Sequence, residues 1–368
     1  GSGRGLLTAG ARASQFNRTP SRATGGSGRG LLTAGARASQ FNRTPSWATG
    51  GSGRGLRAGL ACTGVLGVEP PARAGGARQN RKEDFLLIPF LIASAVGIAY
   101  LGSQILRAPE YVVCSDKIPE PFDGFRILQI SDLHNRFFGK RNENLCGFVR
   151  AHRPDLVAIT GDIVSRDKPD FDAAFSLAEG ICPHADCFFI PGNHEQRLRP
   201  SQTRTLEDGL RERGVRILHN QNVRIYRGDR FIHLYGMEIP LRYYQFPRTR
   251  ETEAAYLIKK RVDELVGPCP RGEFTVLLTH NPLYFPAYAG WGADLTLAGH
   301  VHGGVMRLPK GKGLLSPERS LFPKYSGGVY RHGESLMAVS RGLGESFLGT
   351  RIFNPPEVVS IILQRPER

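Results

Sequence analysis

Five short apolar runs, each ending in a polar residue, constrain the fold of this chain more than any other feature. Consecutive apolar residues without alternation are typical of strands buried on both faces. Their polar ends are equally regular, because each run stops at Asp, Asn or His. The runs are RILQISD (126–132), DLVAITGD (155–162), CFFIPGNHE (187–195), FTVLLTH (274–280) and DLTLAGH (294–300).

Segments of helical length and composition separate these runs, so the sequence predicts an α/β fold. Ligands of such folds gather beyond the carboxyl ends of the strands. We therefore expect the polar ends of the five runs to meet at one edge. The predicted helices are 141–152, 170–181, 203–213 and 251–266, and the predicted strand-and-turn regions are 215–238 and much of 329–364.

The residues at this edge have the chemistry of a metal site. Asp132 and His134 are two apart, so their side chains leave an extended chain on the same side, and His300 and His302 repeat the spacing. Imidazole and carboxylate ligands suit Mn, Zn or Fe. Seven ligands suit two divalent ions about 3.5–4 Å apart that share a carboxylate and clamp a phosphoryl group. The predicted ligands are Asp132, His134, Asp162, Asn193, His280, His300 and His302.

In order, the motifs D-x-H, G-D, G-N-H-E, a single His and G-H-x-H resemble those of the calcineurin-like metallophosphoesterase superfamily. The resemblance covers about residues 110–364. It implies a two-sheet sandwich flanked by helices that hydrolyses a phosphodiester or pyrophosphate bond. Further stretches are similar to the bacterial membrane-associated phosphodiesterase branch: 299–309, 320–330, 340–344 and 353–358.

The resemblance also implies a role for each site residue. One ion would be held by Asp132, His134, Asp162 and His302, and the other by Asp162, Asn193, His280 and His300. His194 is expected to be catalytic, stabilising or protonating the leaving oxygen, with Glu195 orienting its ring. The remaining histidines of the domain match no motif and are expected to be structural: His152, His184, His219, His233 and His332.

An uncharged apolar stretch at 85–106 is long enough to span a bilayer. Arg78, Arg81 and Lys82 precede it and Arg107 alone follows, which places the catalytic domain on the extracytoplasmic side of the membrane. A cleaved signal peptide and a buried helix are the alternatives to a transmembrane anchor.

Residues 1–80 are rich in Gly and Arg and are expected to be a disordered tail. The segment 1–25 recurs at 26–50 with one change, Arg22 becoming Trp47. Such near-identity fits a recent duplication or translation from upstream of the true start. A basic arm that binds nucleic acid or anionic lipid and an inert linker are alternatives.

The tail holds eleven Arg and one acid, and so carries most of the formal net charge of +16. Because the charge belongs to the tail, no nucleic-acid partner is expected for the domain. A nuclease or nucleic-acid-binding protein, and a metal-free scaffold of the same fold, remain alternatives to the hydrolase. A basic, aromatic segment at 242–250 is either a surface that guides an anionic lipid head group or an ordinary solvated loop. Lipid-linked and nucleotide-sugar phosphodiesters are the substrates that the resemblance suggests.

Overall fold

The computed structural model describes residues 105–367, except 245–259, 305, 309–310, 317–320, 345–350 and 352, together with scattered positions between 87 and 102. The tail predicted at 1–80 lies outside the described residues, and so do many positions of the predicted apolar span 85–106. In the part of the chain that is described, no helix combines the length and the hydropathy needed to cross a bilayer.

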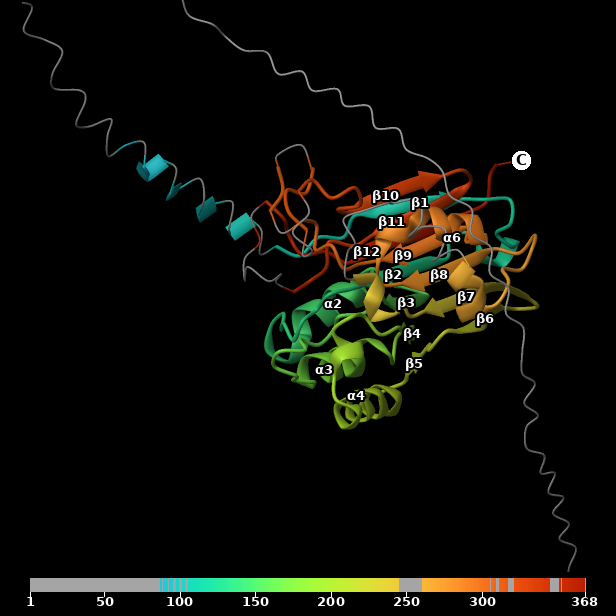
Figure 1. The fold of residues 1–368 in the computed structure, drawn as a ribbon, viewed down its shortest axis with the longest axis horizontal. Helices are drawn as coiled ribbons and strands as arrows, with labels where there is room; N and C mark the ends of the chain where they lie inside the picture. The colour runs from blue at the N-terminus through green and yellow to red at the C-terminus, as the bar shows by residue number, and fades with distance from the viewer. Residues whose placement is uncertain are drawn as a thin grey trace, which may run out of the picture. The chain divides into compact units, whose positions relative to one another are not determined.

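Two six-stranded sheets form the domain (Figure 1). The first has the order β1 (Glu110–Cys114), β12 (Val359–Gln364), β2 (Arg126–Ile130), β3 (Leu156–Ile159), β4 (Asp186–Phe189) and β5 (Val215–Ile217). The second has the order β10 (Gly328–His332), β11 (Ser335–Val339), β9 (Leu295–Ala298), β8 (Thr275–Thr279), β7 (Arg230–Met237) and β6 (Gln221–Arg227).

The centre of each sheet is parallel. Strands β2 to β5 run in one direction in the first sheet, and β7, β8, β9 and β11 do so in the second. All five apolar runs of the sequence are among these strands, as β2, β3, β4, β8 and β9. The parallel arrangement therefore brings their carboxyl ends to one edge of each sheet.

Helices cover the outer faces of the sheets. In the core, α2 (Glu143–Ala151), α3 (Asp172–Ile181) and α4 (Pro200–Glu212) pack on the first sheet, and Figure 1 shows them together at the lower left of the domain. On the second sheet lie α6 (Phe285–Trp291) and a helical segment at 260–266. Short 3₁₀ turns complete the order: η1 (Glu120–Phe122), η2 (Lys140–Asn142), η3 (Glu195–Arg197), η4 (Leu241–Tyr244) and η5 (Pro282–Tyr284).

Successive residues of the apolar strands enter different cores, which explains why these runs are apolar throughout. In β2, Ile127 packs between the sheets, whereas Leu128 and Ile130 pack under the helices. All three are fully buried, and each side chain of this kind contributes about 1.5–3 kcal/mol to folding. The expected two-sheet α/β sandwich is confirmed.

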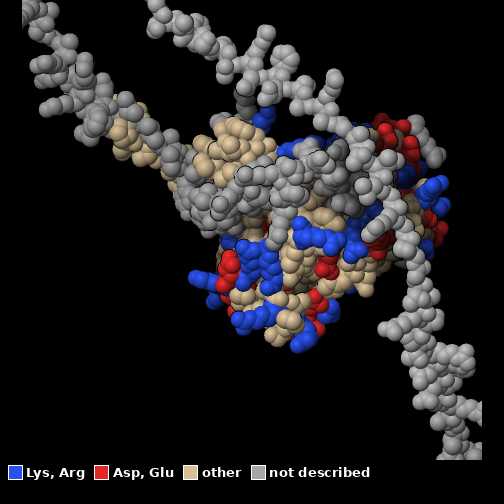
Figure 2. All heavy atoms as spheres, in the orientation of Figure 1, with Lys and Arg blue, Asp and Glu red and all other residues tan. Residues whose placement is uncertain are grey.

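The predicted helices are found where the structure describes them. Helices α2 and α3 match 141–152 and 170–181, and α4 begins at Pro200, a residue favoured in a first helical turn. Of 251–266, only the last seven residues are described, and they are helical. Helix α6 was not predicted, because Pro286 and Gly290 lie in a short aromatic segment that lacks a helical pattern. On the face of the domain shown in Figure 2, acidic side chains lie among the basic ones.

Candidate metal centre

The polar ends of the five runs meet where the carboxyl edges of the two sheets come together. Acidic and imidazole side chains form three overlapping groups here, and within each group the ligand atoms lie within 4.8 Å of one another. The groups are Asp132 with His134 and His302, His134 with Asp162 and His194, and Asp162 with His280 and His300. Asp162 belongs to two of them and so lies between the other ligands, as the bridging role requires.

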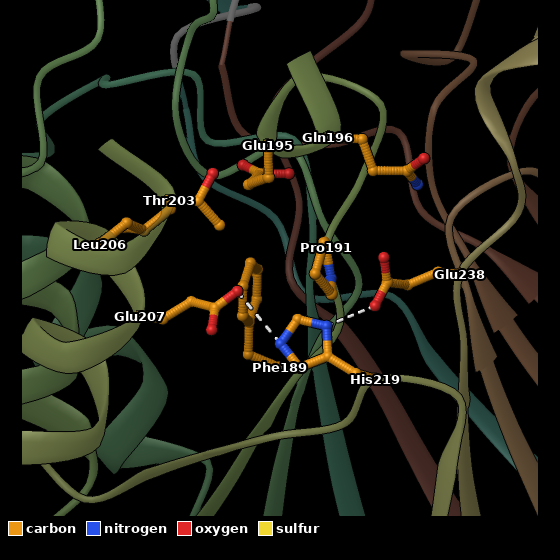
Figure 3. Close-up of a pocket in the computed structure, with 9 residues that line it drawn as sticks. All are labelled: Phe189, Pro191, Glu195, Gln196, Thr203, Leu206, Glu207, His219 and Glu238. Carbon is orange, nitrogen blue, oxygen red and sulfur yellow. Dashed lines mark hydrogen bonds and ion pairs between the residues drawn. The ribbon is translucent and has the colours of Figure 1, made fainter. Parts of the chain in front are cut away.

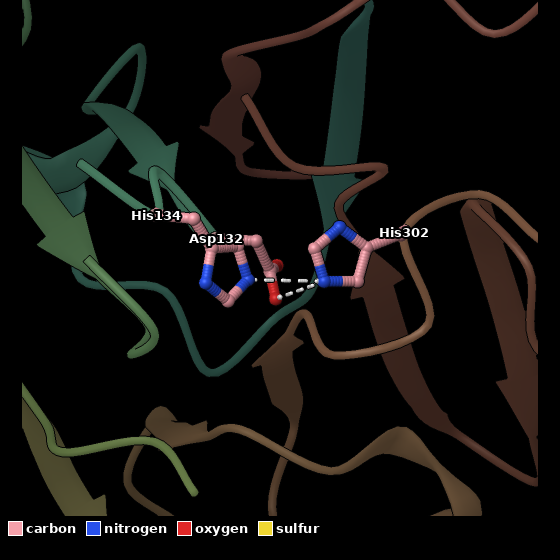
Figure 4. A group of neighbouring side chains, drawn as sticks. All are labelled: Asp132, His134 and His302. Atoms are coloured by element: carbon pink, nitrogen blue, oxygen red, sulfur yellow. Dashed lines mark hydrogen bonds and ion pairs between the residues drawn. The ribbon is translucent and has the colours of Figure 1, made fainter. Parts of the chain in front are cut away.

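The first group presents two imidazole rings to one carboxylate (Figure 4). The Nε2 atoms of His134 and His302 are 3.1 Å apart, and Nε2 of His302 is 3.5 Å from Oδ1 of Asp132. Burial lowers the pKa of His134 to about 3 and that of His302 well below its usual value, so both rings are neutral. Neutral imidazole nitrogens that converge on a buried carboxylate fit a divalent ion.

The third group, Asp162 with His280 and His300, is built around a close pair, because Nε2 of His280 is 3.1 Å from Oδ2 of Asp162. The His280 ring is oriented by its Nδ1, which donates to the carbonyl oxygen of Thr160 at 2.7 Å. Burial alone would lower the pKa of His280, but Asp162 raises it to about 10. Burial would likewise raise the pKa of Asp162, which His280 and His194 hold well below its usual value.

Asn193, the one predicted ligand with an amide side chain, tests independently whether the residues here suit a divalent metal ion. Its side chain is buried, and its Oδ1 has no hydrogen-bond partner among the described residues. An unsatisfied buried acceptor costs about 1–3 kcal/mol, so it is retained where a ligand completes it. An amide oxygen is a suitable donor to a divalent ion. The residues present therefore fit the expected metal chemistry.

Strained backbone marks the same positions. Five of the seven predicted ligands adopt a left-handed conformation that non-glycine residues rarely occupy. Each lies in the turn that follows its strand, where the chain changes direction. Such strain is typical of functional sites. The five φ angles are 53° at Asp132, 47° at His134, 53° at Asp162, 72° at His300 and 51° at His302.

Two glycines let the ligand loops approach closely. A Cβ at Gly192 would collide with the carboxylate of Asp162, and a Cβ at Gly299 would collide with the side chains of Ser131 and Asp132. Without side chains there, the backbone N–H of His300 reaches Oδ1 of Asp132 at 3.1 Å. These contacts lock the end of β9 onto the end of β2, across the two sheets.

Glu195 has a role that the sequence did not predict. Its Oε2 accepts from the backbone N–H groups of Asp162 at 2.8 Å and Gly192 at 2.7 Å, and its Oε1 accepts from Val164 at 3.1 Å. The expectation that Glu195 orients the His194 ring is therefore corrected. It instead joins the turns that carry Asp162 and Asn193. Burial, together with Asp162, raises the pKa of Glu195 to about 7.

The ring of His194 is held by a backbone group. Its Nδ1 accepts from the N–H of Arg166 at 3.2 Å, so in the neutral ring the proton is on Nε2. That Nε2 is 4.0 Å from Oδ2 of Asp162, on the side of the site where the ligands converge. Burial lowers the pKa of His194. His194 thus presents a proton to the candidate site without needing a carboxylate to orient it.

A segment far along the chain supports the site from behind. The backbone N–H of Gly344 donates to the carbonyl oxygen of Asp132 at 2.6 Å, and Nδ2 of Asn354 donates to that of His302, also at 2.6 Å. Arg351, fully buried, donates to three backbone carbonyls, those of Gly344 and Arg341 at 2.7 and 2.9 Å and that of Asn354 at 3.4 Å. We call 340–357 the C-terminal strap. Its motifs were noted in the sequence, but no spacing indicated these contacts.

Beside the site lies a pocket of about 270 Å³ lined by Glu195 and His219 (Figure 3). Nδ1 of His219 contacts Glu238, and its Nε2 is 3.1 Å from Oε1 of Glu207. The hydrogen bond that His219 donates to the carboxylate of Glu238 raises the pKa of His219. This pair of contacts ties α4 to the end of β7. His219 therefore has the structural role expected of it.

Comparison with known proteins agrees with these observations. The sequence profile of the calcineurin-like phosphoesterase family matches residues 125–304, which include all seven predicted ligands and His194. The Bacillus subtilis protein YkuE, an uncharacterized metallophosphoesterase, is 26% identical over 271 residues, which are 72% of this chain and 88% of YkuE. Phosphodiesterase YaeI of Escherichia coli is 28% identical over 244 residues, 65% of this chain and 82% of YaeI.

A third relative is named a transmembrane protein with metallophosphoesterase domain, from Danio rerio. It is 25% identical over 287 residues, which are 75% of this chain and 62% of that protein. The matched family, the relatives and the grouped Asp and His side chains point to the same chemistry. The chain belongs to the calcineurin-like metallophosphoesterase superfamily and is a phosphoric ester hydrolase.

Proposed function

We propose that this protein hydrolyses a phosphodiester or pyrophosphate bond at a centre of two divalent metal ions. The observation that carries the proposal is the position of Asp162, which shares one group with His134 and another with His280 and His300. The first ion would be held by Asp132, His134, Asp162 and His302, and the second by Asp162, Asn193, His280 and His300. Such a pair of ions lowers the pKa of bound water and stabilises charge on the phosphoryl oxygens.

His194 supplies the proton for the leaving group in this proposal. Its Nδ1 is occupied by the Arg166 N–H, and the proton on Nε2 faces Asp162. A leaving alkoxide needs that proton, and general acid catalysis of this kind contributes about 10²–10⁴-fold to the rate.

The surroundings of the site favour an anionic substrate. Burial, and secondarily the positive charge of Arg166, lowers the pKa of Arg197, as expected where positive charges repel each other. Both follow a motif that supplies ligands, G-D in one case and G-N-H-E in the other. An anionic group on the substrate would relieve that repulsion.

Three finer features belong to the same proposal. YaeI is named a phosphodiesterase, which favours a diester over a monoester substrate. The apolar stretch 85–106 and the zebrafish relative's name favour a membrane anchor with the domain on the extracytoplasmic side. The resemblance to the bacterial membrane-associated phosphodiesterase branch suggests lipid-linked or nucleotide-sugar substrates.

A metal-dependent diesterase assay on the full chain in detergent tests the reaction. We expect the protein loaded with Mn to hydrolyse bis(p-nitrophenyl) phosphate and to contain about two ions per chain by mass spectrometry. Asp162→Ala should lose several orders of magnitude in rate and at least one ion. His184→Ala, which changes a histidine outside the metal groups, should match the wild type. An ion-free wild type, or an active Asp162→Ala, would defeat the proposal.

The location of the domain has its own test. Cys114 is exposed at the end of β1, so a membrane-impermeant maleimide reports which side of the membrane it occupies. In intact cells that express a variant with Cys114 as the sole cysteine, we expect labelling without permeabilisation. Labelling that appears only after the cells are lysed would place the domain in the cytoplasm.

A further inference from the structure

Tyr244 has a buried hydroxyl group with no hydrogen-bond partner in the described part of the chain. The residue ends η4, the short turn that follows β7, and only 7% of its surface is exposed. Two other buried tyrosines nearby are satisfied: the hydroxyl of Tyr288 donates to Asn281 and that of Tyr284 to Tyr243, both at 2.7 Å. Tyr244 therefore differs from these two neighbouring tyrosines, whose hydroxyl groups have acceptors within the protein.

The Tyr244 ring lies directly against the candidate metal centre. Its centroid is 4.9 Å from that of His300 in an edge-to-face arrangement and 6.1 Å from that of His280. Both histidines belong to the third group of candidate ligands, together with Asp162. A tyrosine hydroxyl ordinarily keeps its proton at neutral pH, so the phenol has a proton to donate.

The chemistry of a phenol hydroxyl limits which partner can form the missing hydrogen bond of Tyr244. A protonated phenol oxygen is a poor ligand for a divalent ion, whereas its O–H is a good hydrogen-bond donor. As a donor, the hydroxyl requires an acceptor. Leaving a buried donor unsatisfied costs about 1–3 kcal/mol, so the group is retained where an acceptor arrives from outside the protein.

We infer that the Tyr244 hydroxyl donates a hydrogen bond to a non-bridging phosphoryl oxygen of the substrate, on the side of the site formed by His280 and His300. This inference rests on the proposed phosphoesterase function. During phosphoryl transfer, negative charge is spread over the non-bridging oxygens, and fixed donors aimed at them lower the barrier. Tyr244 is then a substrate-binding residue of the reaction, supplied by a turn that carries none of the family's motifs.

Tyr244→Phe tests the inference with little disturbance, because it keeps the ring against His300 and removes only the hydroxyl. In the metal-loaded full chain, we expect kcat/KM for bis(p-nitrophenyl) phosphate to fall about 10- to 100-fold. Calorimetry with inorganic phosphate, which needs no turnover, should show binding weakened about 5- to 10-fold. Metal content should be unchanged, and Tm should be unchanged or higher because no buried donor is left unsatisfied.

Tyr288→Phe is the matched control, since it removes a buried hydroxyl that already has a partner within the protein. It should lower Tm while phosphate affinity stays at the wild-type value. Phosphate affinity and kcat/KM unchanged in Tyr244→Phe would overturn the inference and leave the proposed function standing. Loss of a metal ion from Tyr244→Phe would also overturn it, because Tyr244 would then act through His300. A wild type that binds neither metal nor phosphate would overturn both proposals.

Discussion

Glu195 offers the sharpest test of how the ligand turns are held together. Its carboxylate accepts three backbone N–H groups, from Asp162, Val164 and Gly192, and the side chain is buried. Two substitutions separate the contributions of these bonds. Glu195→Ala removes every acceptor, whereas Glu195→Gln keeps one carbonyl oxygen in nearly the same place.

The expected losses follow from counting the unsatisfied donors. Each buried N–H without an acceptor costs about 1–3 kcal/mol, so Glu195→Ala should destabilise the protein by about 3–9 kcal/mol. Domains are stable by only about 5–15 kcal/mol, so this variant should be close to unfolding. In Glu195→Gln the remaining oxygen can keep the two bonds now made by Oε2. Only the Val164 bond is lost, at a cost of about 1–3 kcal/mol.

Urea unfolding of the metal-stripped protein measures these differences. The experiment belongs at about pH 8, above the raised pKa of Glu195, so that the wild-type carboxylate is charged. Glu334→Gln, at an exposed position in the turn between β10 and β11, should unfold with the wild type. If Glu195→Gln unfolds at the same urea concentration as the wild type, the three bonds do not hold the turns together and the reasoning fails.

Three further predictions concern the leaving group, the C-terminal strap and pH. His194→Ala should slow hydrolysis of an alkyl phosphodiester about 10²–10⁴-fold. Hydrolysis of a p-nitrophenyl ester should be affected much less, since nitrophenolate leaves without a proton. Equal losses of rate on both substrates would show that His194 is not the general acid. Arg351→Met should lower the free energy of unfolding by about 2–4 kcal/mol in denaturant titrations, because three carbonyls lose their donor. A wild-type unfolding curve for this variant would contradict that account. His219→Gln should lower Tm most below about pH 6.5, where His219 is charged between Glu207 and Glu238, and the deficit should vanish as pH rises through the raised folded pKa. A deficit that is independent of pH would contradict the ionic contribution.

The sequence predicts the strands and most of the ligands well, because both depend on local pattern. Ile127 and Leu128 are adjacent apolar residues that enter different cores, so an unbroken apolar run identifies a strand covered on both faces. The polar residue that ends each run then lies at the common edge by geometry alone. That is why Asp132, Asp162 and His280 are found together, although they are far apart in the chain.

What the sequence cannot predict are contacts between elements distant in the chain. Glu195 looks like a partner for its neighbour His194, yet its carboxylate turns toward the strand ends that carry Asp162 and Val164. Arg351 resembles any surface arginine until its burial under the site is known. Tyr244 likewise lies in a basic, aromatic segment that reads as a solvated loop. In each case the partners are set by tertiary packing and not by spacing.

The place of β12 in the first sheet has a consequence for how this protein is made. The strand lies between β1 and β2, where Ile361 pairs with Ile127. During translation, β2 therefore leaves the ribosome long before β12, the strand that completes its hydrogen bonds, has been synthesised. Pairing across so long an interval is slow and leaves an open strand edge in the meantime. We expect the nascent chain to remain incompletely folded, and dependent on chaperones, until β12 has been synthesised.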